Sequence, residues 1–192
     1  MALRDAVLAA LLDGESSGYD LAKSFHASVA NFWTATPPQQ LYRELDRLAA
    51  DGLIEARVVQ QERRPTKRIF SLTPAGHAAI MAFTAAPPKP SIFRNELLIK
   101  VNALDGGDAT AVRGLVAEQL TWSQTKLERY ERMRVRLLAG RDEDDHLANG
   151  TRIGPYLTLL RGIAFEEENI RWAQRTLSVL DRRAASEPIH LA

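Results

Sequence analysis

The most constraining feature of this sequence is a pair of short alternating runs that follows three helical patterns and precedes a fourth. Apolar and polar residues alternate over 54–58 and again over 67–72, and residues 60–66 join the runs, with Pro65 near the tip. Alternation of this kind predicts strands, so the two runs predict a β-hairpin with a charged loop. The order helix, helix, helix, hairpin, helix is that of a winged helix-turn-helix.

The helical patterns of the first half have recognisable starts and stops. Gly14 ends the first pattern and Asp51-Gly52 ends the third, because glycine readily adopts the backbone conformation that follows a helix. Thr36 and Thr73 are each followed by proline, which suits the cap and the first position of a helix. The predicted helices span 2–13, from Ser16 or Ser17 to about 31, from Thr36-Pro37 to about 50, and from Thr73-Pro74 through 83.

A proline-rich string at 85–90 interrupts these patterns, and only helical patterns follow it. Such a break predicts a domain boundary. We therefore expect a DNA-binding winged helix over 1–86, a linker over 87–91 and a helical dimerisation domain over 92–192. The expected fold is mainly α with a small β-hairpin wing. The second domain is predicted to hold a short helix at 92–104, an acidic loop at 141–150, and long helices at 108–140 and from Pro155 to 184.

The two long helices carry apolar residues outside their main stripes, namely Leu115, Trp122, Leu138 and Trp172. Two helices cannot bury a second apolar face against each other. A homodimer is the simplest partner for that face. The alternative is that these residues pack on the N-terminal domain of the same chain.

Composition argues against several classes of protein. The 192 residues include no cysteine, so neither disulfides nor thiolate metal sites are expected. No membrane-length apolar run and no signal sequence is visible, which favours a cytoplasmic protein without membrane contact. None of the four histidines has another at helical spacing, and the acidic runs 142–145 and 166–168 are expected to be a solvated loop and a helix surface. We therefore expect no metal, no cofactor and no enzymatic activity.

Charge is balanced overall, at +1, but not locally. Residues 57–70 hold five basic residues, Arg57, Arg63, Arg64, Lys67 and Arg68, against Glu62 alone. A local basic cluster on a neutral chain is compatible with contact to DNA phosphates. A solvated hairpin tip would have the same composition.

Four blocks of the first half resemble one known family. They are Ser17-Gly18-Tyr19-Asp20-Leu21, Leu41-Tyr42-Arg43-Glu44-Leu45-Asp46-Arg47-Leu48, Asp51-Gly52-Leu53-Ile54, and the run from Arg64 to Gly76. In this order and spacing they resemble the PadR family of bacterial transcriptional regulators. The second half resembles, by architecture, the larger PadR subfamily related to the virulence activator AphA. The resemblance implies a dimeric regulator whose third helix enters the major groove, whose wing lies against the backbone or minor groove, and which responds to a small molecule.

The candidate DNA-binding residues follow from these patterns. Gln39, Gln40 and Arg43 begin the third helix, and glutamine and arginine can pair with adenine and guanine edges. Tyr42 can donate to a phosphate or pack on the second helix. The wing residues are Arg63, Arg64, Lys67 and Arg68, of which Lys67 and Arg68 must point to opposite faces. The amides of Ser17 and Gly18 can hold a phosphate, and Tyr19 beside them is expected in the core or next to the backbone at the start of the second helix.

Trp122 and Trp172 are candidates to line an effector cavity, or are plain core residues. The predicted function is a homodimeric DNA-binding regulator, a repressor on a near-palindromic operator of double-stranded DNA, released by a small-molecule effector. The alternative is a helical protein-interaction adaptor that retains a winged helix without binding DNA.

Overall fold

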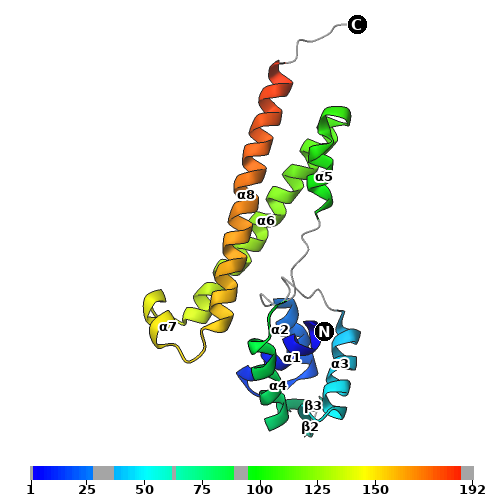
Figure 1. The fold of residues 1–192 in the computed structure, drawn as a ribbon, viewed down its shortest axis with the longest axis vertical. Helices are drawn as coiled ribbons and strands as arrows, with labels where there is room; N and C mark the ends of the chain where they lie inside the picture. Colours follow the sequence, from blue (N-terminus) through cyan, green and yellow to red (C-terminus); the bar gives the residue numbers. More distant parts are fainter. Residues whose placement is uncertain (1, 28–36, 62–63, 89–94, 187–192) are drawn as a thin grey trace. The chain divides into compact units, whose positions relative to one another are not determined.

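The computed structural model describes residues 2–27, 37–61, 64–88 and 95–186. The chain divides into two compact units, Met1–Pro90 and Ser91–Ala192. Figure 1 shows the helices and strands of each unit along the chain. No described helix is long and apolar enough to cross a membrane.

The first unit is a winged helix-turn-helix, as the sequence predicted. Its sheet has the antiparallel order β1-β3-β2, in which β2 and β3 form the hairpin and β1 pairs with the outer side of β3. The elements in chain order are α1 (Ala2–Ala10), η1 (Leu11–Asp13), β1 (Ser16–Ser17), α2 (Gly18–Ala27), α3 (Pro38–Ala50), β2 (Ile54–Gln61), β3 (Arg64–Leu72) and α4 (Pro74–Ala85).

The core of this unit joins the helices to the base of the hairpin. Leu41, Leu45 and Leu48 give α3 a single buried face, and none of them is more than 2% exposed. They pack with buried residues of α1 and α2 and with Ile54 and Phe70 of the hairpin. Because one face of α3 is held in the core, its opposite face is presented to solvent along the whole helix.

The start of α4 is fixed to the turn between α3 and β2. Thr73 caps α4, since its Oγ1 accepts from the Gly76 amide at 3.0 Å. The same hydroxyl lies within hydrogen-bond distance of the carbonyls of Gly52 (2.8 Å) and Leu53 (3.0 Å), and the Thr73 amide donates to the Leu53 carbonyl at 3.1 Å. Gly76 is buried against that carbonyl. This joint holds the base of the wing.

Several predictions for the first unit were wrong in detail. The third helix begins at Pro38, with Pro37 in the cap position and no side-chain cap bond, while Thr36 lies outside the described residues. The strands extend to Gln61 and Arg64, so the expected loop over 60–66 is shorter. The predicted end of the second helix near residue 31 stays untested, because α2 is described to Ala27 and residues 28–31 lie outside the described residues. The two-residue strand β1 was not expected, because two residues cannot show an alternating pattern.

The second unit is built on two long helices that lie side by side (Figure 1). Its elements are α5 (Glu96–Asn102), η3 (Leu104–Gly106), α6 (Ala109–Leu138), α7 (Glu143–Asn149) and α8 (Gly154–Ser186). Both long helices were predicted. The short helix was expected over 92–104; it spans Glu96–Asn102, and 92–94 lie outside the described residues.

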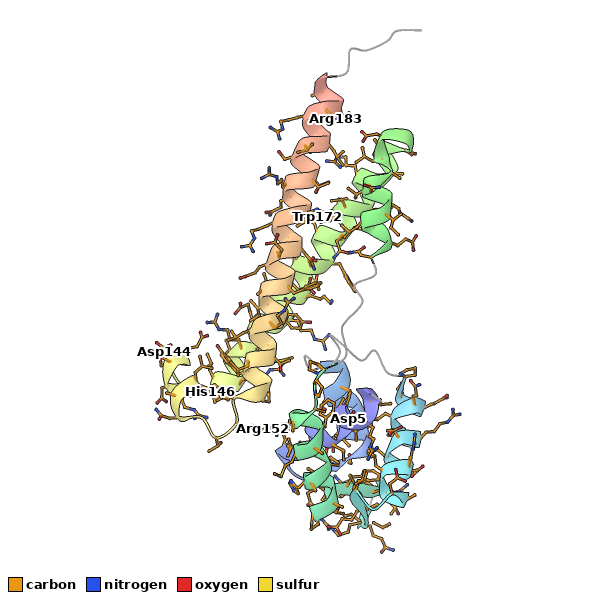
Figure 2. All side chains as sticks on the ribbon, in the orientation of Figure 1. Asp5, Asp144, His146, Arg152, Trp172 and Arg183 are labelled. Carbon is orange, nitrogen blue, oxygen red and sulfur yellow. The ribbon has the colours of Figure 1, made fainter. Side chains whose placement is uncertain are left out.

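The acidic string was predicted to be a loop, and this was wrong. Residues Glu143–Asn149 form α7, whose first turn is capped by the Asp142 carboxylate accepting from the amides of Asp144 (2.9 Å) and Asp145 (3.4 Å). Carboxylates favour the start of a helix because the helix dipole is positive there. On its inner side α7 places His146 (Figure 2), which is only 5% exposed. The imidazole lies edge-on to the ring of Tyr156.

Glu166 was expected on a helix surface, and this too was wrong. It is 1% exposed and lies in the α6–α8 seam. Its carboxylate accepts from Lys126 Nζ at 3.0 Å and from Asn169 Nδ2 at 3.1 Å. Burial raises the pKa of the neighbouring Tyr130 hydroxyl, and the negative charge of Glu166 raises it further. An ion pair is therefore set into the largely apolar stripe between the two long helices.

Candidate nucleic-acid interface

The solvent face of α3 carries the residues predicted to read bases. Gln39, Gln40 and Arg43 are all exposed and lie in the first two turns, on the side away from the buried leucines. Arg43 forms no ion pair with another described residue. Two amides and a guanidinium near the start of one exposed helix match the donors and acceptors that base edges require.

Tyr42 lies where α3 meets the start of α2. The side chain is 44% exposed, and a Cβ added to Gly18 would lie 2.5 Å from Tyr42 Cε1. The aromatic ring therefore rests directly on the Gly18 backbone. This contact supports packing on the second helix, while the exposed fraction leaves part of the side chain accessible to a phosphate.

Ser17 directly precedes α2 and is buried, at 4% exposed. Its Oγ donates to Asp20 Oδ2 at 2.6 Å and accepts from the Asp20 amide at 3.1 Å. The hydroxyl is thus occupied by the helix cap, so only the backbone at Ser17 and Gly18 stays a candidate for phosphate. Tyr19 was expected in the core or next to the backbone; it is 70% exposed, so the core position was wrong. It stands beside this helix start and is a candidate contact that the sequence reasoning missed.

The described part of the wing divides its cations between the two faces of the hairpin. In the antiparallel register Lys67 lies opposite Val59, and Arg68 lies opposite Val58. Neighbouring residues of a strand point to opposite faces, so Lys67 and Arg68 cannot meet the same surface. Arg63 lies outside the described residues, and for Arg64 only the strand position is described.

Arg68 reaches α3. Its Nη1 lies 2.6 Å from Asp46 Oδ1, and its guanidinium carbon lies 5.0 Å from the centre of the Phe70 ring. A second pair joins β2 to the turn before β1, with Arg57 Nη2 at 2.9 Å and 3.0 Å from the two carboxylate oxygens of Glu15. Two of the five cations of the basic cluster are therefore balanced by carboxylates distant in sequence. No local pattern could have identified Asp46 or Glu15 as their partners.

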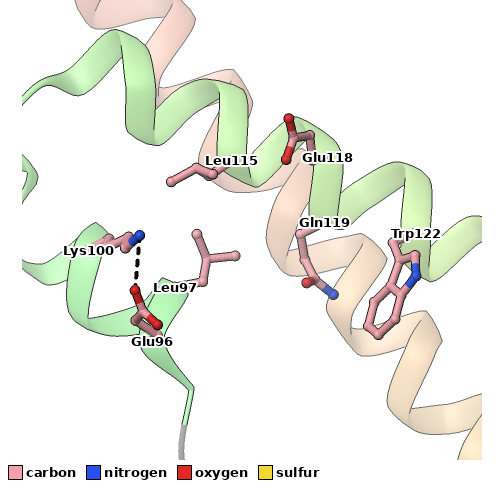
Figure 3. Close-up of a pocket in the computed structure, with 7 residues that line it drawn as sticks. All are labelled: Glu96, Leu97, Lys100, Leu115, Glu118, Gln119 and Trp122. Carbon is pink, nitrogen blue, oxygen red and sulfur yellow. Dashed lines mark ion pairs between the residues drawn. The ribbon is translucent and has the colours of Figure 1, made fainter.

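The two candidate effector residues are not brought together. Trp122 is 60% exposed and lines a groove of about 470 Å³ between α5 and α6, beside Leu97, Leu115 and Gln119 (Figure 3). One face of its indole is covered by Lys126 Nζ, 4.3 Å from the ring centre. Trp172 is half-buried and packs on Val112, Val116 and Ala173 within the same unit. Its expected outward position was therefore wrong.

Metal-binding side chains do not gather in threes anywhere in the described ranges. The carboxylates of 142–145 instead surround the start of α7, where Asp142 serves as the cap.

Two known families match the chain in sequence. The first is described as "Transcriptional regulator PadR-like family" and matches residues 7–82, and the second as "Virulence activator alpha C-term" and matches residues 93–181. A probable transcriptional regulator of Mycobacterium tuberculosis is 29% identical over 95% of this chain and 100% of its own length. The negative transcriptional regulator PadR of Bacillus subtilis is 26% identical over 94% of this chain and 98% of its own.

Solved structures share the fold. Bacillus subtilis PadR in complex with operator DNA is similar with a TM-score of 0.77 and 23% identity, covering 94% of this chain and 99% of that one. The complex of the same protein with p-coumaric acid is similar with a TM-score of 0.72 and 24% identity, covering 94% of this chain and 96% of that one. The Vibrio cholerae virulence activator AphA is similar with a TM-score of 0.67 and 24% identity, covering 94% of this chain and 99% of that one. These likenesses confirm a winged helix combined with a helical C-terminal part.

Proposed function

The chain belongs to the PadR-like family of transcriptional regulators, and from this premise we propose that it represses transcription as a homodimer on a near-palindromic operator. The winged helix, residues 1–86, binds DNA, and the helical domain, 92–192, joins the two copies. Because the proposed target is DNA, the protein acts in the cytoplasm. The family comprises regulators rather than enzymes, and no catalytic step is part of the proposal.

One observation carries the proposal: α3 is anchored by one face and presents Gln39, Gln40 and Arg43 on the other. An anchored helix can enter a major groove without distortion of the domain. The wing residues Arg63, Arg64, Lys67 and Arg68 supply positive charge, with Arg68 on the face of the hairpin toward α3 and Lys67 on the opposite face. The backbone at Ser17 and Gly18, with Tyr42, supplies phosphate contacts. A dimer places two such helices about 34 Å apart, one helical turn of DNA, which favours a two-fold symmetric site.

We further propose that a small molecule releases the DNA by occupying the groove beside Trp122 in the helical domain. The groove offers an exposed indole and two leucines, Leu97 and Leu115, for an apolar ligand, and Gln119 for orientation. The solved complex of the Bacillus subtilis relative with p-coumaric acid makes aromatic acids the first compounds to test. Trp172 packs in the neighbouring core and does not line this groove.

Binding to DNA from upstream of its own gene, measured by fluorescence anisotropy, tests the proposal. Gln40→Ala and Arg43→Ala should each weaken operator binding by roughly 1–3 kcal/mol and binding to a mixed-sequence duplex much less. Arg4→Ala removes the same charge as Arg43→Ala, from an exposed position on α1, and serves as the matched control. Equal weakening on both duplexes would mean that these residues contact the phosphate backbone rather than the base edges. A wild-type protein with no affinity for any duplex would instead favour the protein-interaction adaptor.

The oligomeric state is tested separately on the full chain by light scattering. A dimer at the concentrations that saturate the operator is the expected result. A monomer under those conditions would contradict the homodimer while leaving DNA binding intact.

A further inference from the structure

The ion pair between Arg68 and Asp46 connects the two elements that the proposed function assigns to DNA. Asp46 lies on α3, one turn beyond Arg43, and Arg68 lies on the β3 strand of the wing. Their side chains approach to 2.6 Å, and both remain about half exposed, at 47% for Arg68 and 63% for Asp46. A carboxylate of α3, the helix proposed to enter the major groove, is thus paired with an arginine of the wing.

A carboxylate and a DNA phosphate bind the same guanidinium donors. Arg68 therefore cannot give its Nη1 fully to a phosphate while Asp46 holds it. We propose that Asp46 is an intramolecular competitor for the phosphate backbone: it holds Arg68 in the free protein, and DNA binding transfers Arg68 from the carboxylate to a phosphate. This inference rests on the proposed DNA-binding function and assigns to Asp46 a role in setting affinity.

The contact with Phe70 makes this transfer geometrically simple. Phe70 is 2% exposed and belongs to the core, and the guanidinium carbon of Arg68 lies over its ring, 5.0 Å from the ring centre. A contact through the ring face leaves the N–H edges of the guanidinium available. Arg68 can exchange one oxygen partner for another while its stem and plane stay in place. The half-exposed pair with Asp46 is also weak enough to be broken.

The Arg57–Glu15 pair provides the matched control. It joins one arginine and one carboxylate at similar exposure, 63% and 56%. In the hairpin register Arg57 lies opposite Ile69 while Arg68 lies opposite Val58, so the two arginines lie on opposite faces of the hairpin. Removing Glu15 changes the net charge as removing Asp46 does, but it frees an arginine on the face away from α3.

The experiment compares Asp46→Asn, Glu15→Gln, Arg68→Gln and the double variant Asp46→Asn/Arg68→Gln. Affinity for a mixed-sequence duplex of about 30 base pairs, roughly three helical turns, and for the upstream DNA is measured over a range of salt concentrations. Asp46→Asn should strengthen binding to both duplexes by about twofold to fivefold, the range that an exposed ion pair contributes. Glu15→Gln should give a smaller gain. In the Arg68→Gln background, Asp46→Asn should gain no more than Glu15→Gln does.

The outcomes distinguish a failure of the inference about Asp46 from a failure of the proposed DNA-binding function. If Asp46→Asn weakens binding, Arg68 stays with Asp46 in the complex and the pair is a tether, which overturns the inference. A gain that persists without Arg68, or one no larger than that of Glu15→Gln, overturns it as well, since the effect would then be general charge. All of these results leave DNA binding itself intact. A wild-type protein that binds neither duplex refutes the proposed function and, with it, this inference.

Discussion

Replacing Gly76 with alanine should destabilise the winged helix, although alanine is the better helix former. In the first turn of α4, a Cβ at Gly76 would collide with the backbone carbonyl of Leu53 and lie 3.1 Å from Leu72 Cδ2. That carbonyl already accepts from the Thr73 amide and hydroxyl at 3.1 Å and 3.0 Å. It cannot rotate away without breaking these bonds, so α4 must move from the turn that leads into β2.

The magnitude follows from two opposing effects. The helix propensity of alanine gains at most about 1 kcal/mol over glycine. Overpacking a rigid site costs about 1–3 kcal/mol, and strain on two hydrogen bonds adds roughly 1 kcal/mol. The net free energy of unfolding should fall by about 1–3 kcal/mol. Gly114 in α6 is the matched control, because no atom lies within 4 Å of its Cβ position. Gly114→Ala should raise the free energy of unfolding by about 0.5–1 kcal/mol.

Urea unfolding of both variants measures the difference. With a slope of about 1–3 kcal/mol per molar urea, the Gly76→Ala midpoint should fall by roughly 1 M at unchanged slope. The Gly114→Ala midpoint should rise. A Gly76→Ala variant as stable as the wild type would refute the reasoning, because it would mean that the joint at Leu53 yields without cost.

Three further predictions test other parts of the molecule. Alanine at both Arg63 and Arg64 should weaken binding equally on all sequences and flatten the slope of log affinity against log salt by about 0.9 for each phosphate that is no longer neutralised; an unchanged slope would contradict the wing assignment. Phenylalanine at His146, whose two ring nitrogens are buried without partners among the described residues, should raise the free energy of unfolding measured in urea by about 1 kcal/mol, whereas alanine should lower it. Methionine at Lys126 alone should destabilise by about 2–3 kcal/mol, and the added change Glu166→Leu should restore most of this stability in the same assay.

Local patterns were sufficient for most of the fold. Apolar spacing and the threonine–proline and glycine signals identified every described helix of the first unit longer than one turn, since they depend on neighbours within one or two turns. The capped helix α7 was missed for the opposite reason. Three of its seven residues are acidic and only two are apolar, and the side chain that docks it, His146, is buried by Tyr156 from α8. Such a helix is stabilised by packing rather than by its own sequence.

The sequence sufficed to propose residues for DNA contact and to expect Gln39, Gln40 and Arg43 at the surface, where they lie, but it did not reveal which charges are paired. Residues 57–70 carry a local excess of four positive charges, five basic residues against one acidic. In the folded unit Glu15 and Asp46 cancel two of them. Both carboxylates come from elements far away in sequence, so the field that a phosphate meets is set by the tertiary structure. The wing should consequently bind DNA more weakly than its composition suggests.

The ion pair between Glu166 and Lys126 bears on how α6 and α8 align along their shared apolar seam. On α8, Glu166 falls between Ile163 and Ile170 in the same alternating three- and four-residue spacing as the buried positions, which is the one sequence signal that could have placed it inside. Its nearly complete burial makes the position of Lys126 on α6 decisive. If the helices slipped by one heptad, the apolar side chains would still meet, but the Glu166 carboxylate would be buried without its cation. Because the Lys126 side chain is 31% exposed, losing this partner should cost about 2–3 kcal/mol, somewhat less than the loss of a partner from a fully buried pair, which is still a large part of the roughly 5–15 kcal/mol that stabilises a domain. The pair therefore selects one alignment of α6 and α8 from several that the apolar stripes alone would allow.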